Sequence, residues 1–481
     1  MSSDANRAGT GGHLQKTGID GLDQVLAGGI PQGSIVLLQG ESGAGKTTAG
    51  LQFLLEGVEA GQRSMIASVS QNVSELEVIA DSHGMDLAGV KVLPLGMEYR
   101  QRSEQYTFDT KEAELSDLLN TLYTKLDEEV PDRLVFDSLL ELRLLSHDEA
   151  AYRREILELK RFLVEKKITV IVIDHLVETT EDRQIEGIVH GVVTMTASTP
   201  SIGHTHRQIQ VSKFRGHAFV EGFHDYRIRQ GGVVVFPRVI PRTLPPQRVG
   251  EMLETGDPDF DTMLGGGLEY ASTTLISGQS GTGKSTLATL FATSAAARGR
   301  KAAMFLFEER PEVYRERSEG VGLPVKDYEE SGNLFFRHFD PSEITAGEFS
   351  QTVLNMVENK DLDMVVIDSL SGYLHALPPN FDVMPQIHAL MQYLSRRGLL
   401  VIVTMAQHGL LGEEPKTDID LSFLADSVIL LRHGTENDEI IRSIAVMKKR
   451  NTMHEHRIKE FIIGPGRVQV EERPAHRRPA D

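Results

Sequence analysis

The stretch GESGAGKT, from Gly40 to Thr47, decides the fold of this chain, because it recurs 238 residues later as GQSGTGKS, from Gly278 to Ser285. Both copies follow the pattern G-x-x-x-x-G-K-[S/T], whose glycines let backbone N–H groups surround phosphate oxygens. The lysine of this motif reaches the outer phosphates, and the hydroxyl binds Mg²⁺. Two nucleoside triphosphate sites are therefore expected, with nucleotide contacts from Gly43, Ala44, Gly45, Lys46, Thr47 and Thr48 and from Gly281, Thr282, Gly283, Lys284, Ser285 and Thr286.

The surroundings of the two loops repeat as well. Thr17-Gly18 and Thr255-Gly256 each lie 23 residues before the first glycine of a loop, and GLDQVLAGGI (Gly21 to Ile30) parallels DFDTMLGGGL (Asp259 to Leu268). Each loop follows a short apolar run and opens a helical stretch, which is the context that a phosphate-binding loop requires.

Two domains are expected from a chain of 481 residues that repeats itself after about 235. Apolar runs of four to eight residues alternate with longer helical patterns, which predicts an α/β fold with a mostly parallel sheet covered by helices on both faces. Four prolines between 237 and 246 predict an extended connector. The expected order is a disordered tail at 1–15, a first domain at 16–236, a linker at 237–250, a second domain at 251–470 and a tail at 471–481.

Composition narrows the class of protein. The chain is 40% apolar, yet no apolar run reaches the roughly 18 residues that span a bilayer, and its first residues are polar rather than a secretory signal. Because cysteine is absent, disulfides and thiolate metal sites are excluded, and a cytoplasmic location is expected. The net charge of −19, without a Lys/Arg-rich stripe, disfavours nucleic acid as a partner, although local basic loops could still bind a strand.

An aspartate ends an apolar run in each half, as Asp137 in RLVFDSL and as Asp368 in MVVIDSL. At the carboxyl end of a strand beside the phosphate loop, such a carboxylate can hold Mg²⁺ together with the hydroxyl of Thr47 or Ser285. An aspartate in this place could also cap a turn, but its recurrence favours the metal role.

The halves differ where catalysis is expected. Glu308 and Glu309 follow the run AAMFLF, and the same count from the other loop lysine gives Ser70 and Gln71. Carboxylates next to a triphosphate can orient water or deprotonate a hydroxyl for in-line attack on the γ-phosphate, whereas serine and glutamine cannot act as that base. A solvated turn is the alternative for the acidic pair.

Basic pairs complete the set. Lys213 and Arg215, like Lys448 and Arg450, stand two residues apart on a predicted strand, so both side chains are expected on one face, and Arg442 shares this alternation with Lys448. Such cations suit the charge on a transferring phosphoryl group and could come from a neighbouring subunit. A solvated strand face is the alternative.

These loops, together with the strings FEER and IDSL and the two K-x-R motifs, resemble the KaiC family, the double-domain RecA-like ATPases and autokinases of the circadian clock, from about Leu14 to Val470. The resemblance implies ATP and Mg²⁺ as cofactors, two stacked six-subunit rings of one chain with ATP at subunit interfaces, and phosphorylation within the second ring. It also implies that Lys213 and Arg215 serve the site of a neighbour, and that Lys448 and Arg450 act there with Lys284, Glu308 and Glu309 as the catalytic set. With Ser70-Gln71 in place of acids, the first domain is expected mainly to bind ATP and to support assembly.

The family's phosphoacceptors are a neighbouring serine and threonine, and the matching stretch DLSFLADSVILL offers Ser422 followed by Phe423. One-site autophosphorylation at Ser422 is therefore expected, with Thr417 and Ser427 as substitutes, while the first half offers only Gly187 and Ile188. The residues after Val470 are fewer than in the tail through which clock members engage an activating partner, so regulation through such a tail is not expected. Signalling or clock-type regulatory proteins are possible partners.

Two other classes of function stay open from the sequence. A RecA-like nucleic-acid-dependent motor would share the loops and the strand aspartates, and strand-stimulated ATPase activity would favour it. A non-catalytic assembly switch would use ATP only to hold an oligomer together, although it gives Glu308 and Glu309 no evident role.

Overall fold

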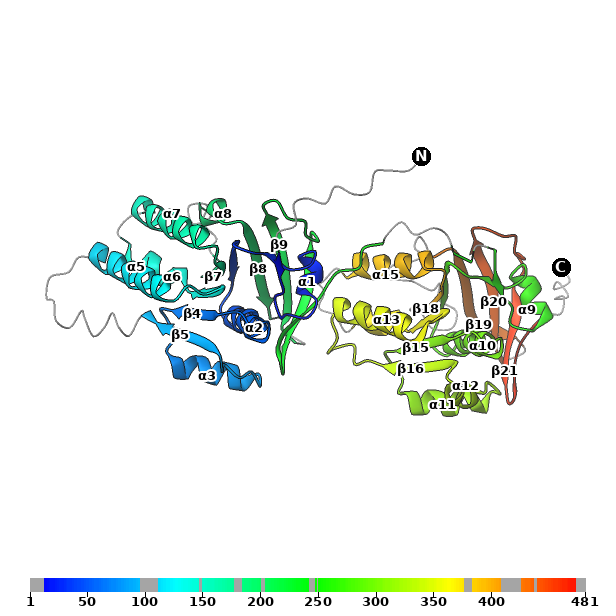
Figure 1. The fold of residues 1–481 in the computed structure, drawn as a ribbon. Coiled ribbons are helices and arrows are strands. Elements are labelled where there is room, and N and C mark those ends of the chain that lie inside the picture. The colour runs from blue at the N-terminus through cyan, green and yellow to red at the C-terminus, as the bar shows by residue number, and fades with distance from the viewer. Residues whose placement is uncertain are drawn as a thin grey trace. The chain divides into compact units, whose positions relative to one another are not determined.

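The computed structural model describes residues 13–95, 111–146, 149–176, 184–199, 204–241, 247–248, 250–375, 383–407, 425–436 and 439–472. The described residues of 13–199 and 205–238 form one compact unit, and those of 239–472 form a second. Figure 1 shows both units and labels many of their elements.

The first unit is built on a nine-stranded sheet in the order β11-β10-β9-β8-β3-β7-β6-β4-β5. The strands from β5 to β8 in this order pair in parallel, and β9, β10 and β11 continue the sheet antiparallel. The strands are β3 (Ile35–Gly40), β4 (Ser64–Ser68), β5 (Val90–Pro94), β6 (Arg133–Asp137), β7 (Thr169–His175), β8 (Gly191–Ser198), β9 (His206–Phe214), β10 (Phe223–Arg229) and β11 (Gly232–Phe236).

Helices cover both faces of this sheet, because successive strand residues point to opposite sides. Val36 and Leu38 of β3 pack in a cluster with α2 and α3, while Ile35 and Leu37 pack in another with α5, α6 and α7. The helices are α1 (Leu22–Val25), α2 (Lys46–Glu59), α3 (Val73–Ser82), α5 (Lys111–Glu128), α6 (Leu139–Leu145), α7 (Glu149–Glu165) and α8 (Gln184–Ile188).

The second unit repeats this plan in a sheet of order β16-β15-β17-β18-β14-β19-β20-β21-β22. Strands β16 to β19 in this order are parallel, and β20 to β22 are antiparallel. The strands are β14 (Ser272–Gly278), β15 (Ala302–Leu306), β16 (Leu334–His338), β17 (Met364–Asp368), β18 (Leu400–Ala406), β19 (Ser427–Glu436), β20 (Glu439–Lys449), β21 (Lys459–Gly464) and β22 (Arg467–Glu471).

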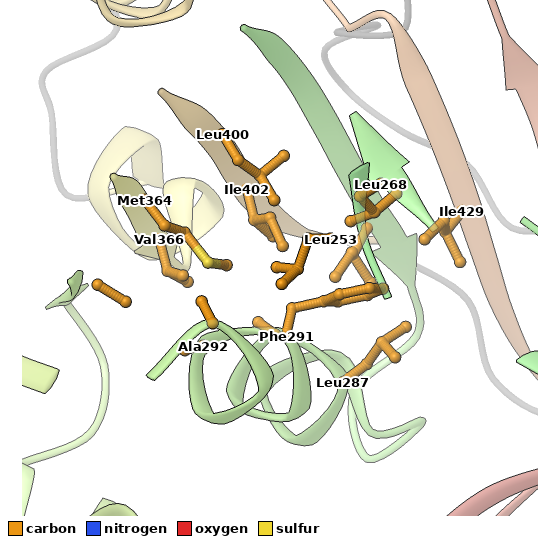
Figure 2. Close-up of a cluster of buried hydrophobic side chains, with 14 of the residues drawn as sticks. Leu253, Leu268, Leu287, Phe291, Ala292, Met364, Val366, Leu400, Ile402 and Ile429 are labelled. Carbon is orange, nitrogen blue, oxygen red and sulfur yellow. The ribbon is translucent and has the colours of Figure 1, made fainter. Parts of the chain in front are cut away.

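Helix α10 (Lys284–Ala297) packs on one face of the second sheet, where Phe291 and Ala292 meet Val366 and Ile402 (Figure 2). Because Phe291 is fully buried, its truncation to alanine would cost about 3–5 kcal/mol. The other face is covered by α13 and α15. The remaining helices are α9 (Pro258–Met263), α11 (Pro311–Gly320), α12 (Val325–Glu330), α13 (Ala346–Lys360), α14 (Leu370–His375) and α15 (Met384–Arg396).

The predicted fold class, two tandem RecA-like α/β domains, is confirmed, and two details of the predicted boundaries are wrong. Leu14 and Gln15, expected in a disordered tail, form β1 (Leu14–Gln15), which pairs with β2 (Ile30–Pro31). Val239, expected in the linker, is buried in the core of the second unit. A second small ladder joins β12 (Met252–Leu253) to β13 (Leu268–Glu269) in the other unit.

Candidate nucleotide sites

Each phosphate-binding loop leaves the carboxyl end of a central strand, β3 or β14, and leads directly into a helix, α2 or α10. The residue before each helix is a glycine with left-handed backbone angles: Gly45 has φ 89° and Gly283 has φ 98°. Glycine adopts this conformation without steric cost. The turn aims the amino end of each helix at the space above the strand, where its N–H groups and dipole favour an anion.

Gly283 allows a test of this turn. A Cβ at Gly283 would lie 2.4 Å from Cδ1 of Ile463 and 3.0 Å from Cε1 of Phe461. We expect Gly283→Ala to lower the stability of the second unit by more than about 1 kcal/mol and to weaken its ATP binding, as measured by thermal unfolding and nucleotide titration. Gly299→Ala is the matched control, because Gly299 also has a positive φ, 73°, but open space around it. Equal losses in both variants would contradict the steric argument.

The loop lysines lie inside their loops. Nζ of Lys46 donates to the carbonyl oxygens of Gly40 and Glu41, both at 2.8 Å, and Nζ of Lys284 donates to those of Gly278 and Gln279 at 3.0 and 2.9 Å. Burial lowers the pKa of both lysines, and nearby carboxylates, first among them Asp137 and Asp368, oppose that shift. A partly desolvated cation at this place would gain from an approaching phosphate.

The first unit brings a hydroxyl and a carboxylate together beside its loop. Oγ1 of Thr47 donates to Oδ2 of Asp137 at 2.8 Å, and Asp137 is only 5% exposed. Burial raises the pKa of Asp137, the charge of Glu141 adds to this rise, and the Thr47 hydrogen bond opposes it. Mg²⁺ is usually held by one or two carboxylates, hydroxyls or waters and the phosphates of the substrate, so this pair fits ATP with Mg²⁺.

The second unit holds its aspartate with two side chains that sequence reasoning missed. Oγ1 of Thr404 donates to Oδ1 of Asp368 at 2.5 Å, and the hydroxyl of Tyr314 lies 3.2 Å from Oδ2. Tyr314 also lies 3.1 Å from the carbonyl oxygen of Ser285, so it joins the start of α10 to Asp368. Thr404 is a lone hydroxyl in the apolar strand LVIVTMA, a signal that could have found it.

The two acidic side chains of the second unit, Glu308 and Glu309, contact different partners. Oε1 of Glu308 accepts a hydrogen bond from Oγ of Ser369, the residue after Asp368, and the charge of Glu308 reaches Lys284. Oε2 of Glu309 instead lies 2.7 Å from a guanidinium nitrogen of Arg317 on α11. Of the two predicted acids, Glu308 is therefore the one directed toward the loop lysine and the strand aspartate.

The first unit has Ser70 and Gln71 in the places of these acids, as the gapless count predicts. The residue before each pair makes the same backbone hydrogen bond, from Val69 to Asp137 at 2.8 Å and from Phe307 to Asp368 at 3.0 Å. Ser70 is exposed, and the backbone N–H of Gln71 donates to Oγ of Ser68 at 3.0 Å.

An ion pair with a buried carboxylate, also missed from the sequence, lies near the first loop. A guanidinium nitrogen of Arg143 on α6 is 2.6 Å from Oδ2 of Asp174 at the end of β7, and Asp174 is 3% exposed. Strand β7 pairs directly with β3, which carries the loop. The pair therefore fixes α6 against the strand that borders the first site.

The paired cations make their contacts outside the loop of their own unit. Lys213 and Arg215 donate to the adjacent carbonyl oxygens of Glu186 and Gly187 on α8, so they share a face as expected, although Arg215 lies one residue past the end of β9. The sheet register places Lys213 level with Leu37, the third residue of β3, whereas the loop leaves the carboxyl end of that strand.

The second unit repeats this placement. Lys448 donates to the carbonyl oxygen of Ala425 at 2.8 Å, and Arg450, one residue past β20, to Oδ1 of Asp426 at 3.1 Å. Oδ2 of Asp426 accepts a hydrogen bond at 3.0 Å from the backbone N–H of Thr273, near the amino end of β14. The loop starts five residues after Thr273, roughly 15 Å along the strand. Each pair is thus remote from its own loop.

The alternation predicted for Arg442 and Lys448 is wrong. The register between β19 and β20 shifts between Val428 and Ile429, so a bulge interrupts β20 and reverses the faces beyond it. Nε of Arg442 donates to the carbonyl oxygen of Gly281 at 3.2 Å, in the loop of its own unit. Arg442 and Lys448 therefore serve different ends of the sheet.

The predicted phosphoacceptor Ser422, its neighbour Phe423 and the substitute Thr417 lie outside the described residues. Ser427, the other substitute, begins β19 and is 3% exposed, which disfavours it as an acceptor. Gly187 and Ile188 lie on α8.

Comparison with known proteins agrees with this architecture. The family model of the KaiC ATPase matches residues 15–240 and 253–475. The chain belongs to the KaiC ATPase family. It is 27% identical over 462 residues to the circadian clock protein KaiC2 of Synechocystis sp. (strain ATCC 27184 / PCC 6803 / Kazusa), covering 94% of this chain and 80% of that protein. It is 24% identical over 458 residues to the circadian clock oscillator protein KaiC of Synechococcus elongatus (strain ATCC 33912 / PCC 7942 / FACHB-805), covering 93% and 87%.

Family membership identifies this chain as an ATP-binding, KaiC-like protein. Within the described ranges, no helix has the length and apolar character needed to cross a membrane.

Proposed function

We propose that this KaiC-like chain is an ATPase and a serine/threonine autokinase, with phosphoryl transfer centred on the second unit and with the first unit mainly binding ATP and supporting assembly. One contrast carries the proposal: Glu308 accepts a hydrogen bond from Ser369 beside Asp368, whereas the equivalent residue of the first unit is Ser70. A carboxylate in that position can take a proton from water or from a hydroxyl during attack on the γ-phosphate.

The roles proposed for the other residues follow from their charge and position. Lys284 would neutralise charge on the outer phosphates, and the backbone of residues 281–286 would bind the phosphate oxygens. Thr47 with Asp137, and Ser285 with Asp368, would hold Mg²⁺, which when bound offsets the negative charge of the phosphates. Lys448 and Arg450 lie too far from their own loop to reach its nucleotide, so they would act at the site of a neighbouring copy, and Lys213 and Arg215 likewise.

Assembly is part of the proposal. Because the basic pairs need a neighbour, we propose that ATP lies at the interfaces of a homo-hexamer of two stacked rings. The names of the relatives, circadian clock proteins, support clock-type or other signalling proteins as further partners. A cytoplasmic location is also part of the proposal, and the absence of cysteine supports it. Native mass measurement should give six copies with ATP and a smaller mass without it; one mass in both conditions would contradict this proposal.

Self-phosphorylation is tested with γ-labelled ATP and Mg²⁺. We expect label at Ser422 and its loss in Ser422→Ala, because a hydroxyl must supply the attacking oxygen. Ser427→Ala is the matched control, since Ser427 is buried at the start of β19 and should leave the label in place. If the assembled, ATP-loaded protein takes up no label, the proposed kinase activity is wrong. If its phosphate release also stays at the background rate, the non-catalytic assembly switch is the function that remains.

A further inference from the structure

In the first unit, the serine that corresponds to Ser369 is Ser138, and it is hydrogen-bonded to a carboxylate. Ser138 follows Asp137 as Ser369 follows Asp368, and Oγ of Ser138 donates to Oε2 of Glu141 at 2.6 Å. In the second unit the equivalent serine donates to Glu308. The two serines therefore each hold a carboxylate, but the carboxylates come from different elements: Glu141 from helix α6, and Glu308 from the residues after strand β15.

The residues around the two serines differ in a matched way. The register of β6 with β7 and of β17 with β18 makes Gly372 the counterpart of Glu141. A Cβ at Gly372 would lie 2.7 Å from Cγ of Glu308, so a side chain there would displace Glu308 from its present position. In the first unit the short Ser70 stands in the place of Glu308, which leaves the space to Glu141. Each of the two serines thus donates to a carboxylate, from a different element in each unit.

The position of Glu141 is further fixed through its helix. Two residues later on α6, Arg143 forms the ion pair with the buried Asp174 at the end of β7. The corresponding residues of the second unit are Leu374 and Met405, which pack in an apolar cluster. Helix α6 is therefore anchored by charge in the unit where it carries the carboxylate, and α14 by apolar contact in the unit where it carries glycine.

We infer that Glu141 is the general base of the first unit and gives it an ATPase activity of its own. This inference rests on the proposed function, in which both units bind ATP, and adds turnover to a unit that otherwise mainly binds. The water oxygen attacks the γ-phosphorus, one of its protons passes to the Glu141 carboxylate, and the bond from the γ-phosphorus to the bridging oxygen breaks with its electron pair left on ADP. The proton then leaves Glu141 for solvent as phosphate departs.

The test uses the full-length chain with Lys284→Ala, which disables the second unit and leaves any remaining phosphate release to the first. In that background Glu141→Gln should lower ATP turnover by about 100-fold while ATP retention by the first unit is unchanged, because Gln keeps an oxygen for Ser138 but cannot take a proton. Glu158→Gln, an exposed residue on α7, is the matched control and should retain turnover. The double variant Ser70→Glu/Glu141→Gly moves the carboxylate to the position that it has in the second unit, and should recover turnover.

Three results would overturn the inference: no residual turnover in Lys284→Ala despite ATP in the first unit, residual turnover that Glu141→Gln leaves unchanged, or turnover that falls together with ATP retention and is not recovered by the double variant. The last result would make Glu141 a structural residue. The unmodified chain separates this failure from that of the proposed function, since phosphate release and label that depend on Glu308 would persist if only the present inference were wrong.

Discussion

Glu308→Gln is expected to lower phosphate release by the second unit, and self-phosphorylation with it, by at least about 100-fold while ATP binding stays intact. The amide oxygen of glutamine can still accept the hydrogen bond from Ser369, so the site keeps its shape, but the amide cannot take the proton of the attacking hydroxyl or water. Single-turnover phosphate release and incorporation of label, each with nucleotide retention measured alongside, separate catalysis from binding.

Two further variants sharpen this test. Glu309→Gln removes one side of the ion pair with Arg317, whose two side chains are 30% and 36% exposed, so it should cost less than about 1 kcal/mol of stability and much less turnover than Glu308→Gln. Glu312→Gln, on the exposed start of α11, is the neutral control. Equal losses at Glu308 and Glu309 would mean that both acids act together, and no loss at Glu308 would remove it from the proposed mechanism.

Local patterns predicted most of the fold. The loop glycines, the buried strands and the strand-ending Asp137 and Asp368 are visible in short stretches of sequence, because each depends on backbone conformation and alternation within one element. The duplication then supplied the number of domains. The order of the strands was not predicted, since it depends on pairings between residues more than a hundred positions apart, such as Ile35 with Val170.

The site was predicted less completely, because its contacts join distant elements. Nothing near Glu308 in the sequence points to Ser369, 61 residues later. The bulge in β20 adds one residue to the strand, and that residue reverses the alternation that would have put Arg442 and Lys448 on one face. Glu141 was not predicted as a site residue, because a glutamate on a short helix is ordinary by itself. Its candidate role is recognised only by comparing the two units, in which Glu141 corresponds to Gly372 and Ser70 corresponds to Glu308.

The second large effect is a loss of stability, which we expect when the ion pair between Arg143 and Asp174 is broken. Arg143→Leu should lower the free energy of unfolding of the first unit by about 3–5 kcal/mol, because it leaves the carboxylate of Asp174 buried without its cation. The double variant Arg143→Leu/Asp174→Met introduces the residue types found at the corresponding positions of the second unit, Leu374 and Met405, where Leu374 packs against the buried cluster that contains Met405. This variant should recover most of the lost free energy of unfolding. Thermal and urea unfolding of nucleotide-free protein, with the transition of each unit followed separately, measure both variants.

The dependence on pH distinguishes an unpaired charge from a packing defect. Burial raises the pKa of Asp174, and Arg143 opposes that rise, so removal of the arginine should raise the pKa further. A carboxyl whose pKa is higher in the folded than in the unfolded state binds a proton more tightly when folded, so the free energy of unfolding increases as the pH falls toward the unfolded pKa. The deficit of Arg143→Leu relative to the unmodified chain should therefore shrink between pH 7 and about pH 5, whereas that of the double variant, which has no carboxyl at position 174, should not shrink. A deficit of constant size across this range would show that lost packing, rather than the stranded carboxylate, destabilises the single variant.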